Sequence, residues 1–170
     1  MSIPFYQASV PVFLRGLANL SAILVKGAEH AKSTKLDPAV LIEARLFENM
    51  YSLPGQIQRA SDTAKGFVAR VAQIDNPKME DNEKTFDELQ ARIAKTVEFL
   101  KSVKPEQIDA GQQREISIFS NSRGEMKFIG TDYLLNFALP NFFFHVTTAY
   151  DILRHKGVPL IKKDYLASMK

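Results

Sequence analysis

The residues whose side chains are best suited to catalysis or binding lie in one short stretch near the C-terminal end of the chain. In NFFFHVTTAYDILRH, the polar residues Asn141, His145 and Thr148 follow one another at intervals of four and three. In a helix these intervals place the side chains on one face. An imidazole titrates near neutral pH, so His145 is the candidate catalytic acid or base. Asn141 and Thr148 are the candidate substrate-binding partners beside it.

A structural explanation competes with this catalytic one. His145 follows directly after the three phenylalanines of FFFH, and a polar residue on an apolar helix is commonly a core residue whose polar atoms are satisfied by a neighbour. Asn141 or Thr148 could be that neighbour. The catalytic interpretation instead predicts that His145 faces the interior of a helical bundle and lines a pocket there.

A second polar group lies on an earlier helical stretch and could border the same pocket. Gln56, Arg59 and Asp62, together with Thr63, are its candidate substrate-binding residues. Arg59 and Asp62 are also spaced to form an exposed ion pair, which would contribute little to stability or function.

The residue inventory excludes several kinds of site. There are no cysteines, which removes thiolate nucleophiles and cysteine-based metal centres. The three histidines stand at positions 30, 145 and 155. The last two are roughly 15 Å apart along a helix, so they cannot share one ion. No phosphate-binding glycine loop, dinucleotide fingerprint or nucleophile elbow occurs. We therefore expect no metal and no cofactor.

Length and composition indicate one globular domain over residues 1–170. The chain is 45% hydrophobic and 24% charged, and its net charge is only +3, without the basic stripe that nucleic-acid binding needs. The N-terminus lacks the features of a signal peptide, and no uninterrupted apolar run is long enough to span a membrane. We expect a cytoplasmic protein that binds neither nucleic acid nor membrane.

The apolar spacing predicts four long helices. The first covers about residues 6–31, the second ends near Ala72 after a start at Ser52, and the third begins at Thr85. Asp37 and Pro38 should start a short extra helix, and Glu88 should complete a capping box with Thr85. The polar segment QIDNPKMEDNEK between the second and third helices is expected to be a long crossover.

The stretch EISIFSNSRGEMKFIG predicts a short β-hairpin, because alternating apolar residues flank an Asn-Ser-Arg-Gly turn. The fourth helix should then begin with Thr131 as its cap, kink or restart at Pro140, and end at Gly157. The fold class is therefore all-α with a short hairpin before the last helix.

These segments resemble DinB-like proteins along nearly the whole chain. PNFFFHVTTAYDILRHKGV and ARLFENMYSLPGQIQRASDTAKG are similar to an uncharacterised branch of that superfamily. The resemblance implies a DinB-like four-helix bundle with a long crossover, frequent homodimers, and in many members a divalent metal ion. Known enzymes of the superfamily are mostly thiol-dependent transferases and isomerases.

The superfamily's metal motif is a histidine pair, four residues apart, on the last helix plus a third histidine on the second. The pair falls on Asn141 and His145 here, and the third position falls near Arg59. Only one ligand remains, and an arginine would repel a cation. The resemblance thus implies a metal site that has degenerated.

Three functions are compatible with these observations. The first is a metal-free pocket that binds a small organic molecule, with His145 as a possible acid or base. The second is a divalent-metal enzyme in which His145 and a carboxylate such as Asp62 hold the ion. The third is a non-catalytic homodimer that serves as an interaction protein.

Overall fold

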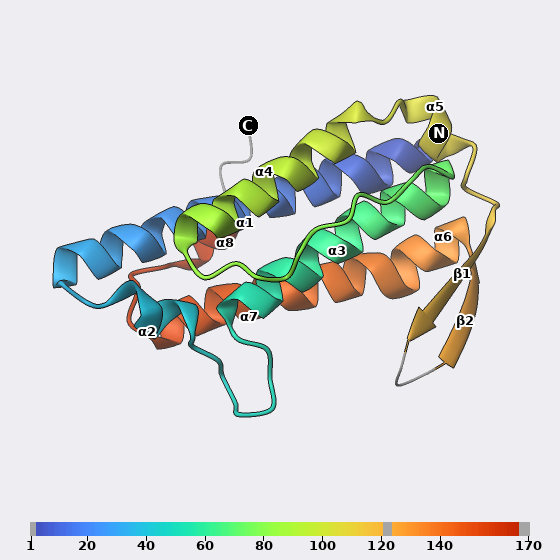
Figure 1. Ribbon diagram of the computed structural model, residues 1–170. Coiled ribbons are helices and arrows are strands. Elements are labelled where there is room, and N and C mark those ends of the chain that lie inside the picture. Colours follow the sequence, from blue (N-terminus) through green and yellow to red (C-terminus); the bar gives the residue numbers. More distant parts are fainter. Residues whose placement is uncertain (1–2, 121–123, 167–170) are drawn as a thin grey trace.

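The computed structural model describes residues 3–120 and 124–166 and shows a bundle of four long helices (Figure 1). These helices are α1 (Phe5–Thr34), α3 (Leu53–Ala72), α4 (Phe86–Ser102) and α7 (Leu139–His155). α1 and α7 run in one direction along the bundle, and α3 and α4 run in the other. α1 and α3 each pack against both α4 and α7. The all-α bundle expected from the apolar spacing is confirmed.

Local signals set the starts and ends of several helices. Asp37 Oδ1 accepts a hydrogen bond of 2.9 Å from the amide of Ala39 at the start of α2 (Pro38–Ile42). Thr85 and Glu88 form the expected capping box at the start of α4. Gly157 adopts a φ of 90° just after α7, a conformation that glycine accepts at little cost. These predictions are confirmed. Each could be made from the sequence because it depends only on neighbouring residues.

The crossover joins α3 to α4 along the length of the bundle. Because both helices point the same way, residues 73–85 must return to the end at which α3 begins (Figure 1). The crossover therefore lies beside both helices and can place its own side chains on them.

The expected hairpin is formed by β1 (Glu115–Ser120) and β2 (Gly124–Ile129), which pair antiparallel. Ile116 lies opposite Phe128, and Ile118 lies opposite Met126. Turn residues 121–123 of the prediction lie outside the described residues. Figure 1 shows the hairpin projecting from the end of the bundle at which α3 ends.

The last long helix is assembled from three segments. α6 (Gly130–Tyr133) leads into a π-helical turn, η1 (Leu134–Ala138), and α7 restarts just before Pro140, as expected. The prediction that Thr131 caps this helix is wrong. Its hydroxyl donates instead to the carbonyl of Gln112, because the chain before the hairpin lies within reach.

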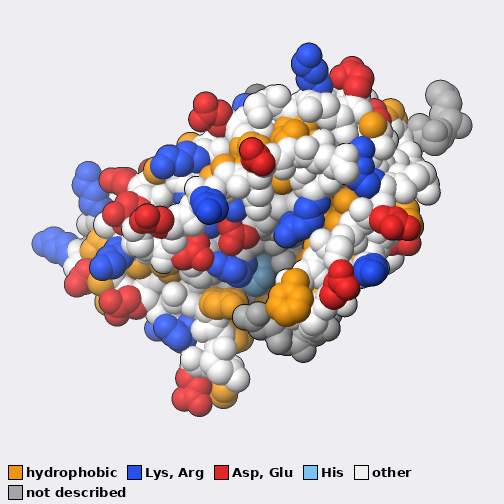
Figure 2. Space-filling model, turned by 45° about the vertical axis from the view of Figure 1, so that its right-hand side comes forward, with side chains coloured by type: hydrophobic (Ala, Val, Ile, Leu, Met, Phe, Trp, Pro, Cys, Tyr) orange, Lys and Arg blue, Asp and Glu red, His pale blue; other side chains and the backbone are white. Residues whose placement is uncertain are grey.

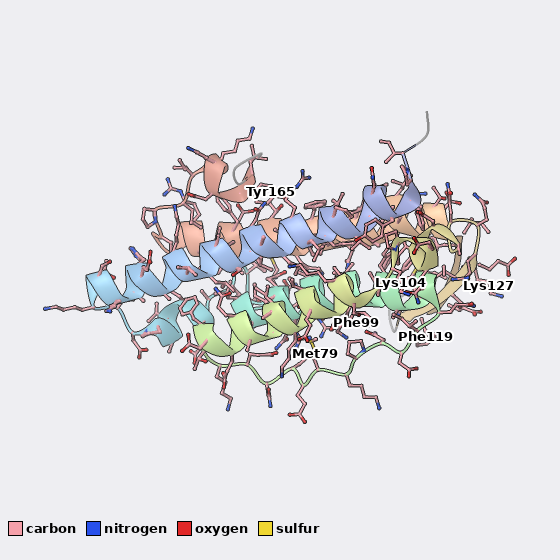
Figure 3. The ribbon with its side chains drawn as sticks, turned by 90° about the horizontal axis from the view of Figure 1, so that it is seen from above. Met79, Phe99, Lys104, Phe119, Lys127 and Tyr165 are labelled. Atoms are coloured by element: carbon pink, nitrogen blue, oxygen red, sulfur yellow. The ribbon has the colours of Figure 1, made fainter. Side chains whose placement is uncertain are left out.

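Two short helices were not expected from the sequence. They are α5 (Pro105–Asp109) and α8 (Lys162–Leu166). α8 packs on α1, where Asn19 donates a hydrogen bond of 2.6 Å to the carbonyl of Tyr165 (Figure 3). The C-terminal segment therefore includes a helix that is docked on the bundle.

An aromatic cluster joins three of the long helices in the core. The ring of Phe13 lies 5.3 Å from Phe67 and 5.0 Å from Phe142, and all three are fully buried. Gly16 makes this approach possible, because a Cβ there would overlap the ring of Phe142. α7 is thereby held close to α1.

The apolar composition of α1 also meets the length and hydropathy expected of a membrane span. An 18-residue window has a mean hydropathy of 1.6, and 44% of it is buried inside the bundle. α1 packs against α4, α7 and α8, and a helix with several neighbours needs apolar residues on a wide face.

Candidate functional site

His145 lies on the face of α7 that meets α3, and 8% of its surface is exposed. Its Nδ1 atom lies 2.7 Å from Oε1 of Gln56 on α3. The expectation that His145 faces the interior is confirmed, and Gln56 belongs to its surroundings as the sequence suggested.

The second hydrogen bond of Gln56 determines the direction of the first. Nε2 of Gln56 donates to the carbonyl oxygen of Tyr51 over 3.1 Å, so Oε1 is the atom that faces the imidazole. An amide oxygen only accepts, and therefore Nδ1 of His145 carries the proton. Nε2 of His145 has no hydrogen-bond partner among residues 3–120 and 124–166, nor is it one of the fully enclosed unpaired atoms. It is the ring nitrogen left to meet solvent or a ligand.

The prediction that Asn141 or Thr148 forms a hydrogen bond with His145 is wrong. Asn141 donates a hydrogen bond of 2.7 Å to the hydroxyl of Thr63, which in turn donates to the carbonyl of Arg59. The Thr148 hydroxyl donates to the carbonyl of Phe144, one turn earlier in its own helix. Short polar side chains on a helix are easily satisfied by the preceding turn or by the facing helix. Asn141 and Thr148 therefore share a helix with His145 but do not bond to it.

The environment of His145 holds its ring in the neutral form. Burial disfavours the imidazolium and, together with the positive charge of Arg59, lowers the pKa of His145 from 6.5 to about 4. At neutral pH this histidine is a hydrogen-bond acceptor or a weak base through Nε2. Its one ring proton is on Nδ1 and is bonded to Gln56, so Nε2 has no proton to give as a general acid.

Two exposed aromatic rings flank the imidazole. The ring centroid of Phe144 lies 5.3 Å from that of His145 in an edge-to-face arrangement, and the ring of Tyr51 lies 6.5 Å away. Phe144 is 57% exposed and Tyr51 is 58% exposed. The guanidinium carbon of Arg59 lies 5.9 Å from the centroid of the Tyr51 ring, within the range of a cation–π contact.

Arg59 and Asp62 belong to a charge network that faces the crossover. Arg59 pairs with Asp62 at 3.2 Å, as the spacing predicted, and with Asp81 of the crossover at 2.6 Å. Asp62 also pairs with Lys65 at 3.2 Å and with Arg92 of α4 at 3.0 Å. Asp62 therefore forms ion pairs with three basic side chains. Basic and acidic side chains are interspersed on the face that Figure 2 shows.

Arg92 is the centre of this network and was not identified from the sequence. Its side chain is 1% exposed and pairs with Asp62, Asp81 and Glu83. Burial alone would lower the pKa of Arg92, but the hydrogen bond and charge of Glu83 and the two aspartates raise it. The only sequence signal was its position on the apolar side of α4, one residue before Ile93.

Several open clefts lie beside the crossover. One of about 720 Å³ runs between the crossover and α4, with Met79 and Phe99 among its lining residues (Figure 3). Another of about 740 Å³ is lined by Tyr51, Asp81 and residues of α2. His145 lines neither of these clefts, nor the two others found among the described residues, so the expectation that it lines a pocket is not supported. Tyr51 thus has the imidazole near its ring and borders the second cleft.

The residues at the family's metal position do not fit a divalent ion. One imidazole is present, Asn141 turns its amide nitrogen toward Thr63, and Arg59 brings a fixed positive charge. In the described part of the chain, no three histidine, aspartate or glutamate side chains come together as a possible metal site.

Comparison with known proteins places this chain in a family. A family model described as a domain of unknown function, DUF1993, matches residues 5–166. The crystal structure of a DinB family member protein from Shewanella denitrificans is similar, with a TM-score of 0.86 and 37% sequence identity. The match covers 96% of this chain and 92% of that chain. No protein with a curated description matches. The chain belongs to DUF1993, an uncharacterised family of DinB-like proteins.

Proposed function

We propose that this protein binds a small organic molecule at His145 without a metal ion, and that Nε2 of His145 is the hydrogen-bond acceptor or base of the site. The observation that carries the proposal is the hydrogen bond between His145 and Gln56. It occupies Nδ1 and leaves Nε2 unpaired among the described residues, and the imidazole has two aromatic neighbours that are more than half exposed.

A purely structural histidine would not need this arrangement. A phenyl ring at position 145 would continue the run of Phe142, Phe143 and Phe144 and would need no buried amide opposite it. An imidazole beside exposed rings instead offers a polar atom among apolar neighbours. Binding sites for small molecules commonly combine apolar walls with a few polar groups.

The pKa of His145 restricts the role that it has in this proposal. With a pKa of about 4, only roughly one imidazole in a thousand is protonated at pH 7. The sequence left open whether His145 acts as an acid or as a base, and the lowered pKa favours a base or hydrogen-bond acceptor. Asn141, Thr148 and Arg59 would contribute to the walls of the site without touching the reacting atom.

A screen of small metabolites by thermal shift tests the proposal. Ligands that raise the melting temperature of the wild type should lose this effect in His145→Phe. His155→Phe is the matched control, because His155 is an exposed histidine of the same helix. If every stabilising ligand acts equally on wild type and His145→Phe, His145 is not part of a binding site.

A dimeric interaction protein is the second candidate. Large apolar side chains are exposed on this side of α7 and in the loop before α3: Phe47 at 62%, Tyr51 at 58% and Phe144 at 57%. Exposed apolar clusters are typical of surfaces that bind another protein. If this is the role, changes to these residues should alter assembly, and His145→Phe should leave it unchanged.

A further inference from the structure

Gln56 determines which nitrogen of the His145 ring is available to a ligand. It is 1% exposed, and its two amide atoms are engaged in opposite directions: Nε2 donates to Tyr51 and Oε1 accepts from His145. Turning the amide over would place its oxygen against the Tyr51 carbonyl and its N–H₂ against the imidazole N–H. The first contact is repulsive whichever ring nitrogen of His145 carries the proton, so one orientation of the amide is favoured.

We infer that Gln56 is a positioning residue that locks His145 in the Nδ1–H tautomer, so that the site takes a small neutral molecule with an O–H or N–H group on a flat apolar body. This inference rests on the proposed function and names its class of ligand. Nε2 is a pure acceptor in this tautomer, and the matching group of the ligand must therefore donate.

A carboxylate is a poor match for Nε2 of His145. Arg59 is the charged side chain that acts on His145. Its guanidinium is already paired with Asp62 at 3.2 Å and with Asp81 at 2.6 Å. The guanidinium is therefore held by two carboxylates of the protein, and a carboxylate ligand would bring no donor for the lone pair of Nε2.

The rings beside His145 provide the surface for the body of the ligand. Phe144 and Tyr51 come from different parts of the chain, α7 and the loop before α3, and flank the same imidazole. Each exposes more than half of its surface, so a flat apolar group packed against either ring would bury aromatic area. The polar donor would then point toward Nε2.

Two measurements on the whole protein test this inference. Long-range proton–nitrogen correlation spectra should show His145 with a protonated Nδ1 and an unprotonated Nε2, the signal being assigned by its loss in His145→Phe. Phenol and anisole are the probes, because they share a ring and differ in the O–H donor. Phenol should shift the Nε2 resonance and bind at least tenfold more tightly than anisole or benzoate.

Variants of Gln56 separate positioning from simple packing. Gln56→Leu removes the acceptor, so the tautomer should become mixed and the preference for phenol over anisole should fall. Gln56→Glu keeps an oxygen opposite Nδ1 and should keep Nδ1 protonated, although it loses the N–H that donates to the Tyr51 carbonyl. Gln58→Leu, on the same helix but bonded to Glu83, is the matched control and should change neither.

Several outcomes would overturn the inference. A protonated Nε2 in the wild type, equal affinity for phenol and anisole, or no detectable phenol binding would each do so. If anisole or benzoate binds as tightly as phenol in a manner that depends on His145, the proposed function stands and only the class of ligand is wrong. A divalent ion bound to Nε2 would overturn both.

Discussion

Gln56 of α3 and His145 of α7 meet in a hydrogen bond of 2.7 Å, although 89 positions separate them in the chain. The bond joins two of the long helices and buries an amide and an imidazole together. It therefore bears on stability as well as on the proposed site, and the two effects can be separated by mutation.

Removing one partner of this bond should cost more than removing both. Gln56→Leu leaves a buried imidazole N–H unpaired and should lower the free energy of unfolding by about 1 to 3 kcal/mol. In the double variant Gln56→Leu with His145→Phe, no N–H is left unpaired, so its loss should be smaller than the sum of the single losses. Urea denaturation of the three variants measures this. Strict additivity would show that the two side chains do not interact.

Asn141→Leu is the control for that cycle. Asn141 bonds to Thr63 and not to His145, so its effect should add to that of His145→Phe without coupling. Coupling between Asn141 and His145 would restore the partnership that the sequence suggested and would contradict the structure.

The stability of the protein should fall between pH 6.5 and pH 4 in a way that depends on His145. Its pKa is lowered from 6.5 to about 4 on folding, so the unfolded chain binds the proton more readily. The contribution of His145 to the free energy of unfolding is fully present above pH 6.5 and is lost as the pH falls through about 4. It amounts to about 3 kcal/mol. Denaturation at several pH values should show this loss in the wild type. If the stability of His145→Phe has the same pH profile as that of the wild type, the pKa of His145 is not lowered on folding.

Arg92→Met should release the crossover from α3 and α4. The change leaves Asp62, Asp81 and Glu83 without their shared cation. We expect a loss of about 2 to 4 kcal/mol, somewhat below that of a fully buried pair because the two aspartates are partly exposed. Hydrogen exchange should also increase in residues 73–85. Lys95→Met, an exposed lysine of the same helix, should change stability little, and an equal effect of both variants would argue against the network.

The protein should purify without stoichiometric nickel, zinc or iron. The donors near His145 are an amide and a guanidinium, which do not bind such ions well. Elemental analysis of protein prepared without a histidine tag should find well below one ion per chain, and a chelator should leave the melting temperature unchanged. About one ion per chain would favour the metal-dependent alternative.

The protein should be a homodimer in solution. The prediction rests on the resemblance to DinB-like proteins and on the exposed ring of Phe144. Light scattering should give about twice the chain mass of 19.1 kDa. Phe144→Ser tests whether this surface takes part, and a wild type that is monomeric at micromolar concentration would remove the claim.

The features predicted correctly from the sequence depend on short stretches of chain. The capping box of Thr85 and Glu88 and the helix start at Asp37 each involve residues within three positions of one another. The apolar spacing and the hairpin pattern are local in the same sense. Local geometry determines such elements before the helices meet, and the DinB-like bundle could therefore be recognised from the sequence.

The partners within the site were decided only by the tertiary structure. Asn141 and Thr148 stand at helical spacing from His145, but Gln56 bonds to it because α3 packs directly against α7. Arg92 gained its role in the same way, since the crossover brings Asp81 and Glu83 onto α4. Helical spacing determines which side chains share a face. Which residues of another helix or loop lie opposite that face depends on how the helices pack and on the path of the crossover.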